Sequence, residues 1–599
     1  MTEQQTKKRE ELDDKYKWNL EKIYANETLW EDDLQTVKKL VDQIVALQGT
    51  MAESAEALLK VLQLSDETGR KAEQLYVYAR MRRDENNAKP IYQALFDRAE
   101  SLSVAANSAT AFIVPEILTI SEAEMQKFMQ KNAELAVYKH ALDEIIRQKE
   151  HILSAPEERL LAMAADLSMA SSHIFTMLNN ADIRFPVIRD EEGHEVELTK
   201  GRYGSFMESS NRQVRQDAFK ALYSSYQKLV NTLGASLNSS VKKDIFYART
   251  RKYPSALSAS LDGDNVYPEV YNRLIEAVHN NMEPMYRYML VRKKQLGLDK
   301  LHMYDIYTPL VKDYKVNIPY EEAQQTILKA LQPLGDEYLS HAQEGLQGGW
   351  VDVYENEGKT SGAYSWGTYD TSPYILMNYD NKLDDMFTLA HEMGHSMHSY
   401  YSNQTQPYIY AQYSIFVAEV ASTVNESLLI DYLLEHSRDK QEKIYLLNHY
   451  LEQFRGTVYR QTMFAEFEKI IHERAEQGEA ITPERLSAIY KDLNQLYYGP
   501  EVVLDEEINM EWARIPHFYS AFYVYKYATG FSAATAIKEA IRQEGAPAVT
   551  RYLEFLKSGG SDYPIALLQK AGVDLTTPEP VDDALQYFAR LLDELESLL

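Results

Sequence analysis

Apolar side chains recur at three- and four-residue spacing along most of this chain of 599 residues. Residues 56–87, EALLKVLQLSDETGRKAEQLYVYARMRRDENN, are typical, because they place apolar side chains on one face of a helix and charged ones on the other. Helices of this kind bury their apolar faces against one another in bundles. Similar segments follow one another from residue 30 to residue 180, with no fixed-period repeat. The sequence therefore predicts a mainly α fold.

Two breaks in the helical pattern predict short β structure. Residues 185–199, FPVIRDEEGHEVELT, have Val and Ile on either side of an acidic turn that ends in glycine, as in a β-hairpin. We expect a domain boundary after this hairpin, between an N-terminal helical domain, residues 1–200, and a second domain, residues 201–599. The second break, residues 345–380, is rich in Gly, Tyr, Thr and Ser and contains YILMNY, which favours strands.

A small β-region in the second break would present an exposed edge strand. An edge strand can pair with an extended peptide, although the same pattern also fits a hairpin that only packs against the core. If the strand does bind a peptide, we expect Gly362 and Ala363, in SGAYSWGTY, to contact it.

Composition excludes several classes of function. The chain has no cysteine, so disulfides, thiolate nucleophiles and Cys-ligated zinc are excluded. A formal net charge of -27 argues against nucleic-acid binding, which needs clustered Lys and Arg. The first residues contain no apolar signal region, and no unbroken apolar run approaches 18 residues. We therefore expect a cytoplasmic protein without a membrane span, and a monomer, although the oligomeric state stays open.

The segment LDDMFTLAHEMGHSMHSYY contains an HExxH motif, His391 to His395. Two residues four positions apart lie on one face of a helix, so both imidazoles can bind one metal ion. Glu392 then lies beside the metal and can take a proton from its bound water. With 14 His in 599 residues, chance predicts this motif only about 0.05 times. The sequence therefore predicts a zinc site of the metallopeptidase type.

A catalytic zinc needs a third protein ligand and an open position. His398 is three residues beyond His395, but a third imidazole from the same turn cannot easily complete a tetrahedron. Glu419 lies in a second apolar helix, SIFVAEVASTVNESLLIDYLL, and would approach from another direction. We predict Glu419 as the ligand, and Glu426, seven residues later, as a residue that can orient a ligand.

The motif in its context resembles a known family. HEMGHSMH, with Glu419 in VAEVAST 28 residues after the first His, resembles the thimet oligopeptidase and neurolysin family of zinc metallopeptidases, closest to its oligoendopeptidase F branch. Three further stretches share this resemblance: SGAYSWGTYDTSPYILMNY, FRGTVYRQTMFAEFE (454–468) and RIPHFYSAFYVYKYATGFSAA (514–534). The resemblance is dense from residue 345 to residue 535.

The resemblance implies a two-lobed helical ellipsoid with a deep central channel that admits short, unstructured peptides. It also implies one zinc per chain, held by His391, His395 and Glu419 in the channel floor, with Glu392 as the general base. The expected activity is that of an oligoendopeptidase, which cuts internal peptide bonds.

The family's His and Tyr that contact the tetrahedral intermediate map onto residues 517–525. His517 matches the family's His, and Tyr525 is the best match for its Tyr. Mammalian-type members have a glycine-rich stretch here, whereas this chain has HFYSAFYVYKY. Tyr519 and Tyr523 are therefore substitutes for the same role or contacts for the substrate.

Two other readings of the motif remain. An angiotensin-converting enzyme-like peptidyl-dipeptidase has the same ligand spacing and needs a cation for the substrate's C-terminal carboxylate, for which Arg514 is a candidate. A non-catalytic helical peptide-binding protein could retain a relic motif. However, drift in such a protein would be expected to change at least one of His391, Glu392, His395 and Glu419, and all four are intact.

Overall fold

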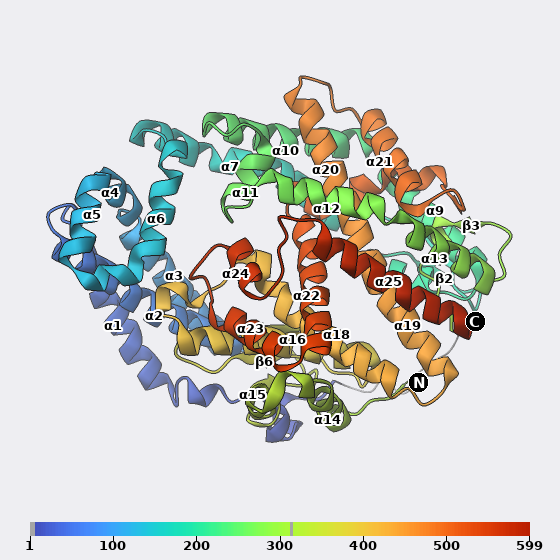
Figure 1. The fold of residues 1–599 in the computed structure, drawn as a ribbon, viewed down its shortest axis with the longest axis horizontal. Helices are drawn as coiled ribbons and strands as arrows, with labels where there is room; N and C mark the ends of the chain where they lie inside the picture. Colours follow the sequence, from blue (N-terminus) through green and yellow to red (C-terminus); the bar gives the residue numbers. More distant parts are fainter. Residues whose placement is uncertain (1–5, 312–315) are drawn as a thin grey trace. The chain divides into compact units, whose positions relative to one another are not determined.

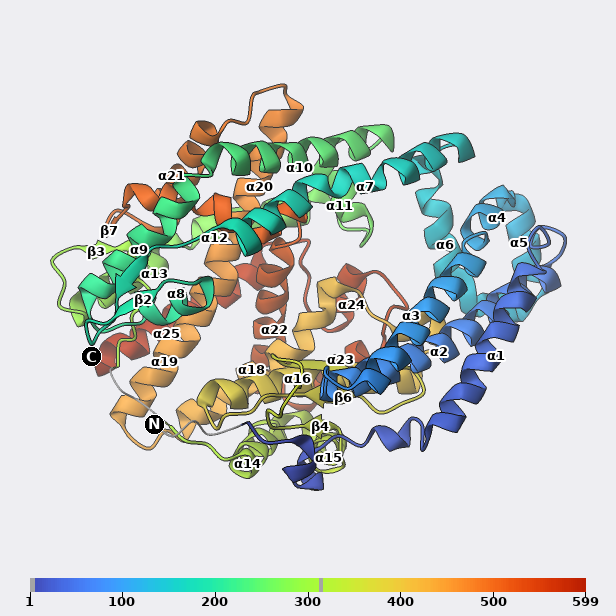
Figure 2. The same ribbon diagram turned by 180° about the vertical axis from the view of Figure 1, so that it is seen from behind.

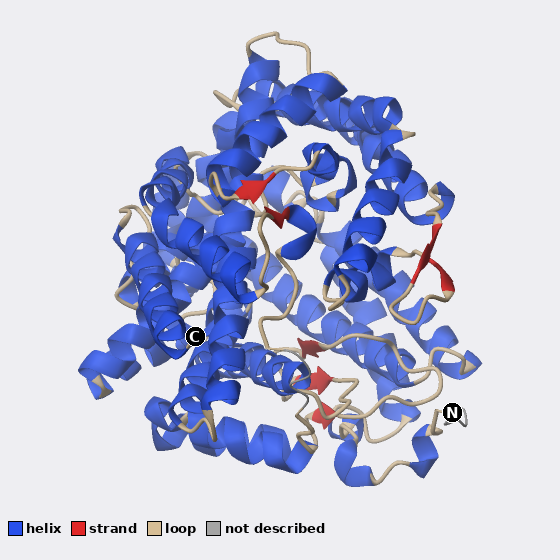
Figure 3. Cartoon of the chain, turned by 90° about the vertical axis from the view of Figure 1, so that its right-hand side faces the viewer, coloured by secondary structure: helices blue, strands red, loops and turns tan. Residues whose placement is uncertain are grey.

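The computed structural model describes residues 6–311 and 316–599. Helices make up most of the described chain (Figure 1), and the strands are short (Figure 3). Within these residues the strands form two two-stranded sheets and one three-stranded sheet. The predicted mainly α fold is confirmed.

The chain divides into two compact units, each built from three separate segments. Unit 1 contains Met1–Lys149, Lys315–Tyr432 and Ile537–Gly572, and unit 2 contains Glu150–Tyr314, Leu433–Ala536 and Val573–Leu599. The boundary predicted near residue 200 divides the chain into two contiguous domains. Each of the two compact units is built from separate segments, so they do not test this boundary, and it stays a prediction.

The helices of unit 1 come from all three of its segments. They are α1 (Glu27–Val45), α2 (Ala55–Glu85), α3 (Pro90–Thr110), α4 (Ile113–Thr119), α5 (Glu122–Lys131), α6 (Lys139–Arg147), α14 (Tyr320–Ala330), α15 (Gly335–Gln347), α16 (Leu383–Thr405), α17 (Tyr408–Ala411), most of α18 (Ile415–Glu435), α23 (Ala546–Lys557) and α24 (Pro564–Lys570). Helices α1, α2 and α3 pack against one another (Figure 1). Their shared core includes Trp30, whose indole N–H donates to the carbonyl oxygen of Leu75 at 3.2 Å.

A three-stranded sheet lies in unit 1, just before α16 in sequence. Its strands are β4 (Val351–Asp352), β5 (Tyr364–Trp366) and β6 (Tyr374–Leu376). Strand β6 is central, pairing in parallel with β4 and antiparallel with β5. The predicted small β-region near the HExxH helix is therefore confirmed, and β5 is one of its edge strands.

Unit 2 contains a second set of helices. They are α7 (Ala155–Met177), α8 (Lys200–Met207), α9 (Arg212–Gln227), α10 (Val230–Thr250), α11 (Ala256–Asp262), α12 (Pro268–Asn280), α13 (Met282–Gln295), α19 (Lys440–Phe454), α20 (Arg460–Glu476), α21 (Pro483–Tyr498) and α25 (Glu579–Leu598). Helix α22 (Tyr525–Glu544) begins in unit 2 and ends in unit 1. Helices α7 and α10 lie side by side (Figure 2).

Unit 2 also contains two pairs of strands. Strands β1 (Val187–Arg189) and β2 (Glu195–Glu197) pair antiparallel, which confirms the predicted hairpin. Strands β3 (Leu301–His302) and β7 (Val502–Val503) pair in parallel, although about 200 residues separate them in sequence.

In the part of the chain that the structure describes, two helical stretches, Pro90–Thr119 and Ala155–Asp182, are long and apolar enough to cross a membrane by length and composition alone. One or two such stretches are weak evidence for a span, because core helices of soluble proteins pass the same test. The sequence analysis did not single out either stretch.

Candidate metal centre and active site

Helix α16 carries the two histidines of the HExxH motif. In its first turn the Asp385 carboxylate accepts a hydrogen bond from the backbone N–H of Lys382 at 3.0 Å, which anchors the start of the helix. Because residues four positions apart share a helix face, His391 and His395 point the same way. Their Nε2 atoms are 3.1 Å apart.

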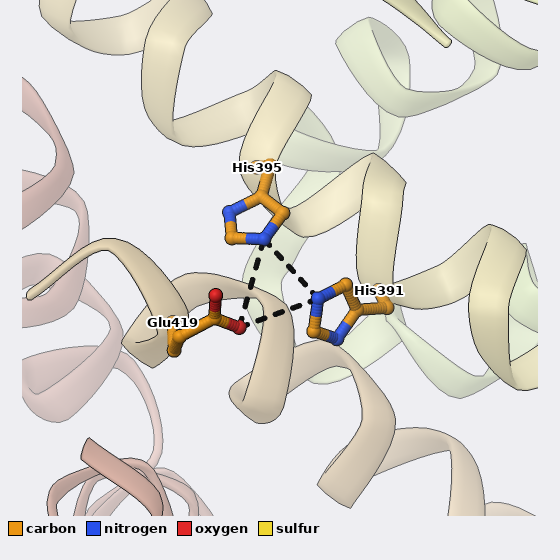
Figure 4. Close-up of side chains that lie close together, drawn as sticks. All are labelled: His391, His395 and Glu419. Carbon is orange, nitrogen blue, oxygen red and sulfur yellow. Dashed lines mark hydrogen bonds and ion pairs between the residues drawn. The ribbon is translucent and has the colours of Figure 1, made fainter. Parts of the chain in front are cut away.

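Helix α18 brings Glu419 to the same point from another direction. Its Oε2 atom lies 3.3 Å from Nε2 of His391 and 3.7 Å from Nε2 of His395 (Figure 4). One ligand atom from each of the three residues lies within 4.8 Å of the other two. Two imidazole nitrogens, one carboxylate oxygen and an open position are the donor set of many catalytic zinc sites. These residues therefore fit a zinc ion.

A glycine allows the two helices to approach closely. A Cβ at position 394 would lie 2.5 Å from the Cα of Ser422 and 2.6 Å from the carbonyl oxygen of Ala421, both on α18. Only glycine leaves room for the α18 backbone at this crossing. This close crossing of α16 and α18 lets Glu419 reach the histidines.

Glu426 is not one of the three converging residues, but it contacts His391. Its Oε1 atom is 2.5 Å from Nδ1 of His391. A carboxylate at this distance holds a proton on Nδ1, which leaves the lone pair of Nε2 directed at the metal position. The predicted orienting role of Glu426 is therefore supported by geometry.

Glu392 follows the first histidine and is 8% exposed. Burial raises the pKa of its carboxyl group, the charge of His391 lowers it and that of Glu419 raises it, giving a pKa of about 7. The backbone N–H of Ser365, in β5, donates a hydrogen bond to the same carboxylate. A carboxylate with a pKa near neutrality can both accept and return a proton.

His398 does not belong to this group of ligand atoms. Its ring stacks on Tyr413 at 3.6 Å and lies 5.3 Å from the ring of Phe555. Burial lowers its pKa to about 3, so it is a neutral side chain of the core of unit 1. The preference for Glu419 over His398 as the third ligand therefore agrees with the arrangement of side chains.

The comparison with known families decides the identity of the chain. The family model described as peptidase family M3 matches residues 205–587, which is more than half of the chain. The chain belongs to peptidase family M3. A second family model, described as oligopeptidase F, matches residues 116–185. The resemblance stated from the sequence is confirmed: the protein is an M3 metallopeptidase of the oligopeptidase F type.

Relatives of this M3 peptidase match it over nearly its whole length. Oligopeptidase PepF of Bacillus subtilis (strain 168) is 50% identical over 582 residues, which cover 97% of this chain and 87% of the relative. An oligoendopeptidase F homologue of Lactococcus lactis subsp. lactis (strain IL1403) is 42% identical over 595 residues, 99% of each chain. The crystal structure of oligoendopeptidase F from Enterococcus faecium has 39% identity and a TM-score of 0.73, covering 96% of this chain and 99% of that one.

Neighbouring groups shift the pKa values of the two histidines in opposite directions. Burial lowers the pKa of His391, but hydrogen bonds to Glu419 and Glu426 raise it, to about 10. Burial and the charge of His391 both lower the pKa of His395, to about 4. A proton on Nε2 of His391 therefore competes with zinc for this nitrogen.

We expect zinc affinity to rise with pH. The pKa of His391 in the metal-free protein is about 10, so below that pH each zinc ion bound should release about one proton. Affinity should then increase about tenfold per pH unit between about pH 6 and pH 9. Calorimetry in buffers of different ionisation enthalpy measures the released proton directly. Zinc binding that is independent of pH over this interval would contradict the assignment.

The edge strand of the sheet in unit 1 lies beside the general-base candidate. Ser365 in β5 donates to Glu392 through its backbone N–H and shares a hydrogen bond with Ser396 of α16, Oγ to Oγ, at 2.8 Å. Gly362 precedes the strand with a φ of 85°, and its carbonyl oxygen accepts a hydrogen bond from Asn378 at 2.8 Å. Ala363 follows it and is partly exposed. Gly362 and Ala363, two of the residues predicted to contact substrate, therefore lie directly before β5.

His517 lies in unit 2, in the 3-10 helix η11 (Pro516–Tyr519), where burial lowers its pKa. Its ring centre is 6.3 Å from that of Tyr523 and 6.0 Å from that of Tyr527, and the two tyrosine rings are 5.5 Å apart. All three side chains are partly exposed. The structure thus groups His517 with Tyr523 and with Tyr527, which the sequence analysis did not select.

The other two tyrosines of this segment are more deeply buried. Tyr525 is 0% exposed, and its ring centre lies 5.1 Å from that of Tyr271 in the core of unit 2. Tyr519 stacks on Phe175 at 4.4 Å. The assignment of Tyr525 as a catalytic residue stays a prediction. The assignment of Tyr519 as a substrate contact stays one too, and neither side chain shares the partly exposed face of His517.

Proposed function

We propose that this M3 peptidase is a zinc-dependent oligoendopeptidase that hydrolyses internal bonds of short, unstructured peptides. One observation carries the proposal: Nε2 of His391, Nε2 of His395 and Oε2 of Glu419 lie within 4.8 Å of one another. The Glu392 carboxylate lies on α16, the helix that carries the two histidines. The printed names of the relatives, oligopeptidase and oligoendopeptidase, support the proposed class of substrate.

In the proposed mechanism, His391, His395 and Glu419 hold one zinc ion per chain. Bound zinc supplies positive charge that polarises a peptide carbonyl and makes water more acidic. Glu392 accepts the proton of the attacking water and returns it to the nitrogen of the leaving amine. The hydrogen bond from Ser365 orients the Glu392 carboxylate for both transfers. Glu426 keeps His391 in the tautomer that binds metal.

We further propose that His517 and a tyrosine donate hydrogen bonds to the carbonyl oxygen as it gains negative charge. Tyr523 and Tyr527 are better candidates for this role than Tyr525 and Tyr519, because they lie near His517 and are partly exposed, as it is. An extended peptide would lie along β5, contacting Gly362 and Ala363. The two-lobed form with a deep channel remains part of this proposal.

The tyrosine assignment predicts a clear order of effects. Tyr527→Phe removes one donor and should lower kcat about 10²–10³-fold, the usual scale for a single oxyanion donor. Tyr525→Phe should change kcat less than about threefold, because this side chain lies in the core. The measurement is kcat on a quenched peptide, with the unfolding temperature as a control for folding. A larger loss for Tyr525→Phe would restore the sequence-based assignment.

The class of cleavage is tested with blocked peptides. We expect a peptide with an acetylated N-terminus and an amidated C-terminus to be cut at internal bonds, and a stable folded domain to survive. A strict peptidyl-dipeptidase would leave the amidated peptide intact. Mass spectrometry of the products identifies the bonds that are cut. Cleavage only of peptides with a free C-terminal carboxylate, two residues at a time, would refute endopeptidase action.

The structure weakens the case for Arg514 as a carboxylate anchor. Its Nη2 atom lies 2.5 Å from Oε1 of Glu511, and Glu511 is 1% exposed. An arginine already paired with a buried carboxylate gains less from a substrate carboxylate. We therefore propose Arg514 as a structural residue. A cytoplasmic monomer that binds neither nucleic acid nor membrane also remains part of the proposal.

A further inference from the structure

The FRGTVYRQTMFAEFE segment has no part in the proposed chemistry, yet its last residue is a fully buried acid. Glu468 lies in α20 and is 0% exposed. Its Oε1 atom accepts a hydrogen bond from the backbone N–H of Phe522 at 3.0 Å, and its Oε2 atom has no hydrogen-bond partner among the described residues. Because burying an acidic side chain costs free energy, an apolar residue would be the usual choice at this position.

The surroundings of Glu468 favour its neutral, protonated form. Burial raises the pKa of this carboxyl group well above its usual range; the hydrogen bond from Phe522 lowers the pKa, and the charge of Asp244 raises it. A protonated carboxyl group still offers an oxygen that accepts the N–H of Phe522. The side chain therefore supplies a hydrogen-bond acceptor to its surroundings, and does not need a negative charge to do so.

Phe522, the residue that donates to Glu468, has an uncommon backbone conformation. Its φ of 56° lies in the left-handed region, which a bulky residue adopts only where the surrounding structure determines it. Its side chain is 1% exposed, and its ring centre lies 4.6 Å from that of His472 in α20 and 5.8 Å from that of Tyr271 in α12. This packing holds the ring of Phe522, whereas the backbone is held by hydrogen bonds.

Both polar atoms of the peptide group that joins Ala521 to Phe522 are bonded. The N–H of Phe522 donates to Glu468, and the carbonyl oxygen of Ala521 accepts from Oγ of Ser260 in α11 at 2.9 Å. In a trans peptide group the N–H and C=O bonds point in opposite directions, so the two contacts hold the peptide plane from both sides. Rotation of this plane would change φ of Phe522. The two hydrogen bonds therefore stabilise the left-handed turn.

Helix α22 follows this turn directly. In its first turn the backbone N–H of Tyr527 donates to the carbonyl oxygen of Val524 at 3.2 Å. The direction in which the chain leaves Phe522 therefore determines where the side chains of Tyr523 and Tyr527 lie. Their ring centres are 6.3 Å and 6.0 Å from that of His517.

We propose that Glu468 is a positioning residue for peptide hydrolysis, because it holds the turn at Phe522 that places Tyr523 and Tyr527 beside His517. The inference rests on the proposed function, in which His517 and a tyrosine donate hydrogen bonds to the carbonyl oxygen. A displacement of about 1 Å can cost a group that acts in the transition state about 10²-fold in rate. Glu468 is fully buried, so it acts through the tyrosines and not on the substrate.

Two substitutions of Glu468 separate its role as an acceptor from its charge. Glu468→Gln keeps an oxygen that accepts from Phe522, so kcat should stay within about threefold of the wild type. Glu468→Leu removes the acceptor, so kcat should fall about 10²-fold while KM changes less than about threefold. Zinc content should match the wild type in both variants. A large loss of kcat in the glutamine variant would overturn the proposal, because it would show that the charge is required.

Hydrogen exchange, measured by mass spectrometry on the full-length zinc-loaded enzyme, reports on the turn independently of activity. In Glu468→Leu we expect peptides that cover residues 519–527 to exchange about tenfold faster or more, because a buried N–H has lost its acceptor. Ser260→Ala removes the other hydrogen bond of the same peptide group at an exposed position. It should change exchange and kcat in the same direction by a smaller factor, and it provides a test if the leucine variant does not fold. Unchanged exchange in these variants would contradict the proposal.

Met289→Ala is the matched control for a general loss of stability. Met289 is 0% exposed in α13, a helix of unit 2 that contains none of the residues of the turn. Its truncation should lower the unfolding temperature but leave kcat and the exchange of residues 519–527 unchanged. Equal effects of Met289→Ala and Glu468→Leu on kcat would show that Glu468 only stabilises the fold.

The double variant Tyr523→Phe, Tyr527→Phe distinguishes a failure of this inference from a failure of the proposed function. We expect a loss of kcat in both the double variant and Glu468→Leu, with faster exchange of the turn in Glu468→Leu. If only the double variant loses kcat, the proposed role of the tyrosines stands and the positioning role of Glu468 is wrong. If exchange rises in Glu468→Leu and neither variant loses kcat, the proposed role of the tyrosines is wrong, and the positioning role is refuted with it.

Discussion

Replacing Glu392 with glutamine is expected to lower kcat by about 10²–10⁴-fold, the usual scale for loss of a general acid–base group. Glutamine keeps the size and the hydrogen-bond acceptor but cannot take a proton. Glu392 is not one of the three converging ligand residues, so the zinc content should stay near that of the wild type. Peptide binding should change little, because the lost interaction is made only in the transition state.

Single-turnover rates and zinc content, measured on the same preparation, decide this prediction. Asp384→Asn is the matched control, since it also converts a carboxylate of α16 to an amide but at an exposed position in the first turn. It should leave kcat unchanged. If the Glu392 variant kept most of its kcat, or lost its zinc, Glu392 would not be the base.

Replacing Glu419 with glutamine is expected to weaken zinc binding by at least about 100-fold, the upper end of the losses seen for residues outside the ligand sphere. The variant replaces the only charged carboxylate among the three converging ligand residues with a neutral amide. Activity at limiting zinc should fall in parallel and recover in part at high zinc.

The variant His398→Ala tests whether His398 binds the zinc ion or only lies near the residues that bind it. His398 stacks on Tyr413 in the core of unit 1, so its removal should lower the unfolding temperature but leave zinc affinity nearly unchanged. Competition titration with a zinc chelator measures both variants. The opposite ranking, with zinc affinity lost in the histidine variant and kept in the glutamate variant, would show that the third ligand was wrongly chosen.

Local sequence was enough to predict the metal centre. The spacing of His391 and His395 fixes their shared helix face, whatever the rest of the fold does. Glu419 followed because a third ligand must come from a different direction, and α18 supplies it across the crossing at Gly394. These inferences depend on helix geometry and on metal coordination, both of which are visible in a single sequence.

The tyrosine proposed to act with His517 was harder to predict, because the turn before α22 determines which tyrosines share a face with it. Phe522 has a φ of 56°, an uncommon value for a residue other than glycine, and α22 begins three residues later at Tyr525. Through this turn the spacing of tyrosines no longer tells which of them share a face. The family resemblance made Tyr525 the best match and kept Tyr519 and Tyr523 as substitutes, whereas the structure groups Tyr523 and Tyr527 with His517.

The division into two units could not be predicted for a different reason. Helices α18 and α22 both run from one unit into the other, so no composition shift or linker marks the change. The parallel pair β3 and β7 joins residues about 200 positions apart through strands of two residues each. Strands that short carry no periodic signal.

The central claim is that His391, His395 and Glu419 hold the zinc ion on which hydrolysis depends. Metal analysis of the purified active enzyme, combined with stepwise removal and return of zinc, tests it most directly. We predict about one zinc per chain, loss of activity in proportion to zinc removed by a chelator, and recovery in the same proportion when zinc is restored. A fully active preparation that contains no divalent ion would contradict the claim.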